Sequence, residues 1–207
     1  MELTTCLWFN GNAREAADFY TSIFPDSSIQ DNWIAPTDTP GNKQGEEIVV
    51  NFKIFGQKFI GLNGGPQFPH SEAVSFQIPC KDQSEINKYW DLLTSNGGEE
   101  SQCGWLKDRF GISWQVTSPI MNTFLGGSDP KGAERATQAM LKMRKIDLAQ
   151  MEAAYHGNWG KLQYKDEKPC YEALFRTMPP NSGGPKGRSK KLKYARQGNK
   201  VDPRLCS

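Results

Sequence analysis

The chain has 207 residues, of which 37% are hydrophobic and six are tryptophan, enough to form the core of one ordinary domain or of two small modules. Its apolar runs are far shorter than the ~18 residues of a membrane span, and the N-terminal MELTTCLWFN lacks the basic and long apolar regions of a signal peptide. Five cysteines without a CxxC pair favour reduced thiols in the cytoplasm over a disulfide framework.

The net charge of +2 is unevenly distributed along the chain. Residues 1–155 carry 13 Lys and Arg against 19 Asp and Glu, whereas residues 156–207 carry 12 against 4. The sequence therefore predicts a mildly acidic body followed by a basic tail.

A strand-like run over residues 4–9 precedes the clearest helix signal in the chain. Asn12 can cap a helix, and Glu15, three residues later, can complete a capping box. The apolar face then follows helical spacing, at Ala16, Phe19, Tyr20 and Ile23. Pro25 ends the predicted helix.

The same pattern recurs seventy residues further along the chain. The helix cap, its capping-box partner and the four apolar positions correspond in the second copy to Asp82, Glu85, Ile86, Tyr89, Trp90 and Leu93. Similarity at a fixed long offset indicates two copies of one supersecondary unit. The second helix is predicted over about 83–95, ending at Asn96-Gly97-Gly98.

Strands fill the rest of both copies. In the first copy they are predicted at 28–34, and at 47–55 and 57–63 as a hairpin around Gly56. In the second copy they are predicted at 74–79, 99–105, 106–109 and 112–117, with Asp108 to Gly111 as a turn.

The pattern changes after the second copy. Alanines and methionines at helical spacing predict one long amphipathic helix over about 131–155. Residues 156–207 are basic and of low complexity, with few apolar side chains between 181 and 207, and this tail is predicted to be mostly disordered. Its cluster GRSKKLKYAR could contact nucleic acid, but a solvated end is favoured because Tyr194 is its only aromatic residue.

These elements predict an α+β fold: two βαβββ modules, at about 3–64 and 72–118, form a curved sheet around a cavity. Alternation places Val74, Phe76 and Ile78 under the second helix and Ser75 and Gln77 toward the cavity. The seventy-residue offset then places Thr5 and Leu7 toward the cavity in the first copy. Ser113, Gln115 and Thr117 are predicted to face inward from the last strand, and Gly61 and Asn63 from the strand before the linker.

Several segments resemble a known family over roughly residues 3–155. The paired βαβββ pattern with DFYTSIF in the first helix resembles the vicinal-oxygen-chelate superfamily, the glyoxalase and bleomycin-resistance fold. FNGNAREAADFY, GLNGGPQF, VSFQIPCKDQSEINKYW and GGEESQCGWLKDRFGISWQV are similar to its PhnB-like branch, which often carries a demethylubiquinone-methyltransferase label.

The resemblance also implies where a metal would be held. Metal-using members carry ligands in the first and last strands of each module, positions that fall here on Thr5, Gly61, Ala73 and Gln115. Among these, Gln115 alone has a side chain suited to a divalent ion, whereas a catalytic site needs about three protein ligands. We therefore expect neither a metal nor another cofactor.

The leading hypothesis is a small-molecule-binding protein, cytoplasmic and homodimeric, that spans no membrane. Neutral polar groups and aromatic side chains are predicted to line its cavity, as is usual for ligand pockets. The predicted lining residues are Thr5, Leu7, Phe9, Asn63, Phe68, Ser75, Gln77, Trp105, Ser113 and Gln115. Two alternatives remain open: a metal-dependent lyase, isomerase or dioxygenase, and a regulatory protein that binds partners through its basic tail.

Overall fold

The computed structural model describes residues 2–158, so the predicted disorder of the tail falls almost wholly outside the described residues. The first module runs β1 (Thr5–Phe9), α1 (Ala13–Ile23), β2 (Ser28–Ile34), β3 (Glu47–Ile54) and β4 (Gln57–Asn63). The second runs β5 (Phe76–Pro79), α2 (Gln83–Thr94), a 3₁₀ turn (Ser95–Gly97), β6 (Glu99–Glu100), β7 (Trp105–Lys107) and β8 (Ser113–Thr117). Three short helices follow: α3 (Met121–Leu125), α4 (Pro130–Met140) and α5 (Leu148–Tyr155).

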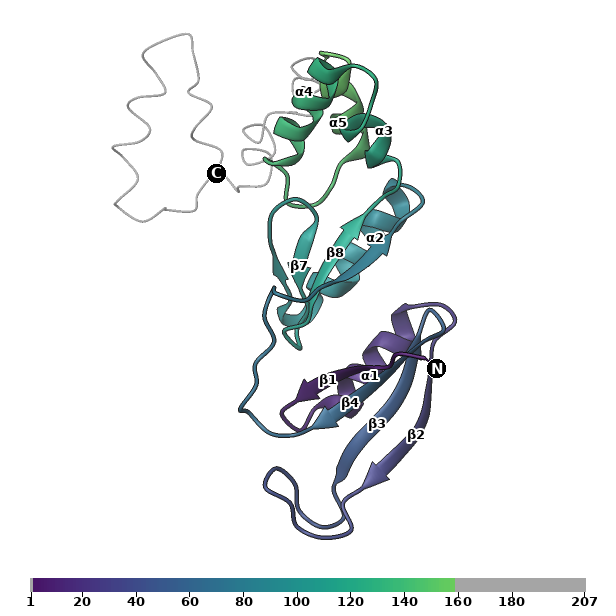
Figure 1. The fold of residues 1–207 in the computed structure, drawn as a ribbon, viewed down its shortest axis with the longest axis vertical. Helices are drawn as coiled ribbons and strands as arrows, with labels where there is room; N and C mark the ends of the chain where they lie inside the picture. The colour runs from purple at the N-terminus through teal and green to yellow at the C-terminus, as the bar shows by residue number, and fades with distance from the viewer. Residues whose placement is uncertain (1, 159–207) are drawn as a thin grey trace, which may run out of the picture. The chain divides into compact units, whose positions relative to one another are not determined.

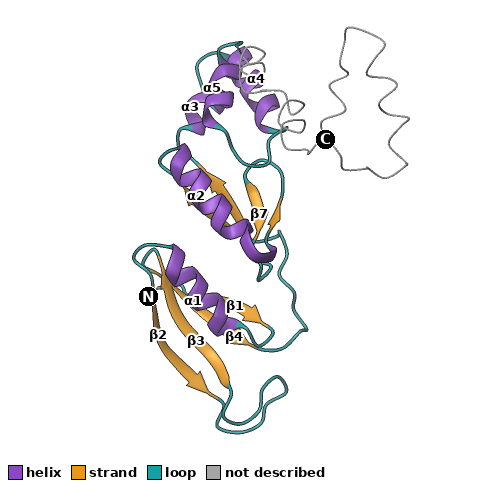
Figure 2. Cartoon of the chain, turned by 180° about the vertical axis from the view of Figure 1, so that it is seen from behind, coloured by secondary structure: helices purple, strands orange, loops and turns teal. Residues whose placement is uncertain are grey.

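The two modules have the same topology, which confirms the α+β class and the duplicated βαβββ unit. Strand order is β1-β4-β3-β2 in the first sheet and β5-β8-β7-β6 in the second. In each sheet the first strand pairs in parallel with the last, and the remaining pairs are antiparallel. Each sheet carries one helix, α1 or α2, on the same relative face (Figures 1 and 2).

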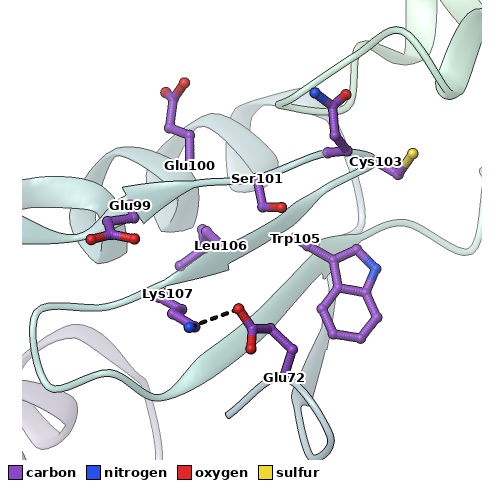
Figure 3. Close-up of a pocket in the computed structure, with 9 residues that line it drawn as sticks. Glu72, Glu99, Glu100, Ser101, Cys103, Trp105, Leu106 and Lys107 are labelled. Carbon is purple, nitrogen blue, oxygen red and sulfur yellow. Dashed lines mark ion pairs between the residues drawn. The ribbon is translucent and has the colours of Figure 1, made fainter. Parts of the chain in front are cut away.

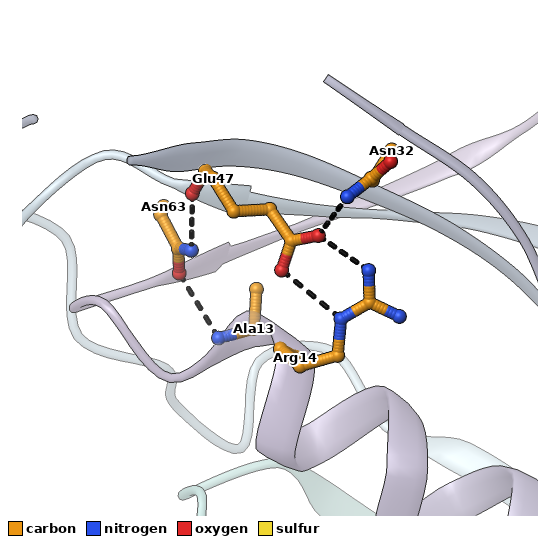
Figure 4. Close-up of polar contacts among 5 residues, drawn as sticks. All are labelled: Ala13, Arg14, Asn32, Glu47 and Asn63. Atoms are coloured by element: carbon orange, nitrogen blue, oxygen red, sulfur yellow. Dashed lines mark hydrogen bonds and ion pairs between the residues drawn. The ribbon is translucent and has the colours of Figure 1, made fainter. Parts of the chain in front are cut away.

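The two long helices begin by different means although their sequences align. At α2, Asp82 accepts a 3.0 Å hydrogen bond from the Glu85 N–H, as the capping box predicts. At α1, the Asn12 side chain makes no capping hydrogen bond. Instead, Asn63 Oδ1 at the end of β4 accepts a 2.9 Å bond from the Ala13 N–H (Figure 4). The first capping box is therefore replaced by a cap from a distant strand.

An aromatic core joins the two modules. Tyr20 and Phe24 of α1 lie 5.6 and 5.3 Å from Trp114 of β8, measured between ring centroids. Phe59 of β4 meets Phe76 of β5 edge-to-face at 5.4 Å. Aromatic rings bury large areas and favour such tilted contacts, so burial of this cluster stabilises both modules together.

Residues 131–155 form two helices instead of the predicted single one. The chain leaves α4 after Met140 and begins α5 at Leu148, where Asp147 accepts a 2.9 Å bond from the Gln150 N–H. The intervening segment uses its carbonyls elsewhere: Met143 and Arg144 accept bonds from the Cys103 and Gly104 N–H groups. Contacts with the second sheet thus break a helix that the apolar spacing alone would continue.

Val74 also departs from its predicted place under the second helix. Strand β5 begins at Phe76, and Val74 is 70% exposed in the turn that precedes it. None of the helices that the structure describes is both long and apolar enough to cross a bilayer.

Candidate functional site

Each sheet has an open face, defined as the face turned away from its helix. In the first sheet a Cβ added at Gly61 would lie 3.1 Å from Ala13 Cβ and 3.6 Å from Phe9 Cε2. Gly61 and Phe9 therefore face α1. Because side chains alternate along a strand, residues of the other parity in β1 and β4 form the open face.

The structure thereby reverses the predicted orientation of four lining residues. Thr5, Leu7 and Phe9 share one face of β1, the face that meets α1, and Asn63 is buried as the α1 cap. The reason lies in the connection between strand and helix. Phe9 is the last residue of β1 that faces α1, and Ile78 is the last residue of β5 that faces α2. Counted from these residues, the connection is one residue longer in the second module than in the first. A shift of one residue exchanges the two faces of a strand.

One row of side chains across the open face of the first sheet is instead apolar. Trp33, Val49, Leu62 and Trp8 are register partners in a row across all four strands. Trp33 is 61% exposed. Trp8 is fixed by a 2.7 Å bond from Nε1 to the Gly65 carbonyl and by the Phe68 ring at 4.9 Å. Phe68 therefore lies on this open face.

One row of side chains across the open face of the second sheet is uncharged. Gln77, Gln115 and Trp105 are register partners across β5, β8 and β7. Gln115 Nε2 donates a 2.8 Å bond to Ser75 Oγ, so these side chains share a face. Ser113 has the same parity but is only 2% exposed. Ser75, Gln77, Ser113 and Gln115 therefore lie on one face of the second sheet.

A pocket of about 480 Å³ opens at the β6–β7 edge of the second sheet (Figure 3). Trp105 and Lys107 of β7 line it, and Glu72 pairs with Lys107 at 2.7 Å. The other lining residues come from β6, β7 and the loop between them: Glu99, Glu100, Ser101, Gln102, Cys103 and Leu106. The pocket combines an aromatic wall with an ion pair, and sequence analysis found only Trp105 among its lining residues.

The positions that would hold a metal do not fit one. Thr5 and Gly61 lie on the α1 side of their sheet, while Gln115 lies on the open face of the other. Ala73 has no ligating group. Among residues 2–158 no three His, Cys, Asp or Glu side chains are grouped so as to hold a metal ion. We therefore derive no step through a metal.

A buried carboxylate joins the two modules, and sequence analysis did not identify it as a site residue. Asp108, only 3% exposed, accepts bonds at Oδ2 from the Tyr20 hydroxyl at 2.7 Å and from Trp114 Nε1 at 2.8 Å. Its Oδ1 accepts from the N–H groups of Phe110 and Ile112, which shapes the predicted turn. Burial raises the pKa of Asp108, and these hydrogen bonds oppose that rise.

His70 lies beside this network, in the linker between the modules. Its ring is 5.6 Å from the Phe9 ring, and among the described residues its Nε2 is buried with no hydrogen-bond partner. Burial lowers the pKa of His70, and the Trp8 backbone and the Asp108 charge oppose that shift. The residues around position 70 show no pattern that indicates a buried histidine.

Two sheets of this topology define the glyoxalase-like fold. The family model described as 3-demethylubiquinone-9 3-methyltransferase matches residues 1–117, and the chain belongs to that family. No curated protein matches the chain.

Several solved structures are similar to part of the chain. A Bacillus cereus PhnB protein, provisionally named a 3-demethylubiquinone-9 3-methyltransferase, is 31% identical with a TM-score of 0.51. The match covers 57% of this chain and 99% of that one. A Pseudomonas aeruginosa protein matches at 19% identity and a TM-score of 0.46, over 57% and 97% of the two chains. A lactoylglutathione lyase of Agrobacterium tumefaciens matches at 14% and 0.30, over 57% and 93%.

The family description names methyl transfer, which needs a methyl-donor cofactor. A nucleotide-like cofactor is usually held where a glycine-rich turn joins a strand to a helix. Here those connections are Asn10–Asn12 and Cys80–Asp82, and neither carries a run of glycines. The first N–H of α1 is already bound to Asn63. These residues do not fit such a donor, and no methyl-transfer step is derived.

Proposed function

We propose that this domain binds a small organic molecule on the open face of its second sheet, and that this binding requires no metal ion. The row of Gln77, Gln115 and Trp105 carries the proposal. These side chains offer neutral hydrogen-bonding groups beside an aromatic ring, and Trp105 also lines the pocket of about 480 Å³. A few fixed polar groups on an apolar wall are typical of small-molecule sites.

The test is ligand-observed NMR with a fragment library on the purified full chain. Gln115→Leu removes the neutral amide at the centre of the row, and we expect at least a threefold loss of affinity for fragments that bind there. Gln138→Leu alters an exposed glutamine of α4 and serves as the matched control. Equal binding by both variants, or no fragment binding to the wild-type chain, contradicts the proposal.

Metal analysis separates this proposal from the enzymatic alternative. A metal-dependent lyase, isomerase or dioxygenase would purify with a stoichiometric divalent ion and lose activity on chelation. The neutral oxygens available near Gln115 bind divalent ions weakly without carboxylate or imidazole ligands. Detection of a stoichiometric divalent ion would therefore contradict the proposal that the domain binds its ligand without a metal.

We also propose that the protein is a cytoplasmic homodimer. The apolar row ending at Trp33 is a surface that a second copy would cover, because exposed apolar patches mark interaction sites. Free thiols at Cys6, Cys80 and Cys103 support a reducing compartment. Native mass spectrometry of the wild-type chain and of Trp33→Ser tests the dimer. Truncation of the chain after residue 156 tests whether the basic tail binds a partner.

A further inference from the structure

The wall of the pocket at the β6–β7 edge is held by residues outside the family region. Cys103 and Gly104 donate backbone hydrogen bonds of 2.8 and 2.7 Å to the carbonyls of Met143 and Arg144. The family model ends at residue 117, before those two residues. The segment between α4 and α5 therefore fixes the loop between β6 and β7. A part of the chain that lies outside the family region thus shapes the pocket.

Carboxylates outnumber cations among the side chains that line this pocket. Lys107 pairs with Glu72 at 2.7 Å and is the cross-strand register partner of Glu99. Glu100 is engaged on the other face, where it accepts a 2.9 Å bond from Trp90 Nε1. Lys107 is the one cation among the side chains that line the pocket, so together with Glu72 and Glu99 it leaves one net negative charge beside Trp105.

The Trp105 ring is available to a ligand. It is half-buried in the pocket wall, beside the Glu72–Lys107 pair in Figure 3. Cation–π contacts within residues 2–158 use the rings of Tyr89, Phe19 and Phe110, and not that of Trp105. Indole is the side chain that attracts cations most strongly through its ring face.

A buried hydroxyl on the same face also lacks a partner. Ser113 is the register partner of Lys107, and within the described part of the chain its Oγ is buried and accepts or donates no hydrogen bond. Buried polar groups are usually paired, and each exception calls for a missing partner. Ser113 is not among the residues that line the pocket, so its hydroxyl is not assigned to the ligand.

We propose that this pocket binds a small organic cation, a substituted ammonium that carries an apolar group. The ammonium lies between Glu72 and Glu99, and the apolar group and the ring face of Trp105 lie against each other. This inference rests on the proposed small-molecule function and names its ligand class. It goes beyond that function because it assigns a charge sign to the ligand and a site at the sheet edge.

Calorimetric titration of the full chain with three benzyl compounds of different charge tests the charge sign of the ligand. The probes are benzyltrimethylammonium, benzyl alcohol and phenylacetate, at low and at physiological salt. We expect the cation to bind at least about threefold more tightly than the other two, because a cation–π contact at a partly exposed site contributes about that factor. The preference should shrink as salt screens the carboxylates.

Three variants locate the binding site. Trp105→Leu, Glu72→Gln and Glu99→Gln should each weaken benzyltrimethylammonium binding by about threefold or more, from loss of the ring face or of a carboxylate. Phe124→Leu and Glu134→Gln make the matched changes away from the pocket and should leave binding unchanged. Far-UV circular dichroism confirms that each variant is folded.

Each outcome decides between the two proposals. Cation preference that Trp105→Leu abolishes supports the inference. Equal or tighter binding of phenylacetate or benzyl alcohol, still sensitive to Trp105→Leu, overturns the cationic ligand and leaves the small-molecule function standing. Cation binding that none of the three pocket variants changes overturns the site. Absence of binding by all three probes overturns the cation pocket, and the fragment screen then decides the wider function separately.

Discussion

The Tyr20 hydroxyl in the first module donates a 2.7 Å hydrogen bond to Asp108 in the second. The bond joins two copies of one unit through a single buried carboxylate. Arg109, the next residue, pairs with Glu15 of α1 at 3.2 Å and lies over the Phe19 ring. The turn before β8 therefore anchors the second module on the first helix of the first.

Removing the Tyr20 hydroxyl should destabilise the domain measurably. In Tyr20→Phe, Asp108 Oδ2 keeps only the Trp114 donor, and a buried hydrogen bond to a charged group contributes about 1.5–3 kcal/mol. Urea denaturation should show a fall in unfolding free energy of that order. Tyr89→Phe, at a buried tyrosine in the second module, is the control and should change stability by less. Equal losses would contradict the anchoring role of Asp108.

Stability should fall in mild acid because of His70. Its pKa is lowered in the folded state, so the unfolded chain binds the proton more readily. The folded state is favoured above the ordinary histidine pKa of about 6.5, and this contribution is lost as the pH falls below that value. Denaturation midpoints between pH 7.5 and 5.5 should change less in His70→Gln than in the wild type. A slope unchanged in His70→Gln would refute the assignment.

Two asparagines should differ sharply in their effect on α1. Asn63→Ala removes the acceptor for the Ala13 N–H and the 2.8 Å donor to the Glu47 carbonyl, and loss of a cap typically costs about 0.5–2 kcal/mol. Asn12→Ala removes no capping hydrogen bond and should change stability by less than about 0.5 kcal/mol. Thermal denaturation of both variants checks this order, and the reverse order would favour the sequence-based capping box.

Cys80 should resist alkylation in the folded protein. Burial, with the nearby Glu85 and Asp82 charges, raises the pKa of its thiol to about 12, and the thiolate is the reactive form. Iodoacetamide at pH 8 should label exposed Cys6 first and reach Cys80 only when urea unfolds the domain. Peptide mass spectrometry resolves the two sites. Early labelling of Cys80 would show that the end of β5 opens in the native state.

The spacing of residues by itself determined the duplicated architecture. Helical periodicity at Ala16 and Tyr20 recurs at Ile86 and Trp90, and Gly56 marks the β3–β4 hairpin, because local geometry sets both signals. The faces of β5 and β8 were also predictable, since polar and apolar residues alternate there.

Only the tertiary structure decided which face of β1 is buried. Its sequence TCLWF is apolar at both parities, so period-two alternation carries no preference, and the neighbouring α1 sets the orientation. The cap by Asn63, the anchor between Tyr20 and Asp108, and the pocket beside Trp105 each join residues from separate segments. Sequence patterns report local periodicity, whereas these contacts depend on how distant segments pack against one another.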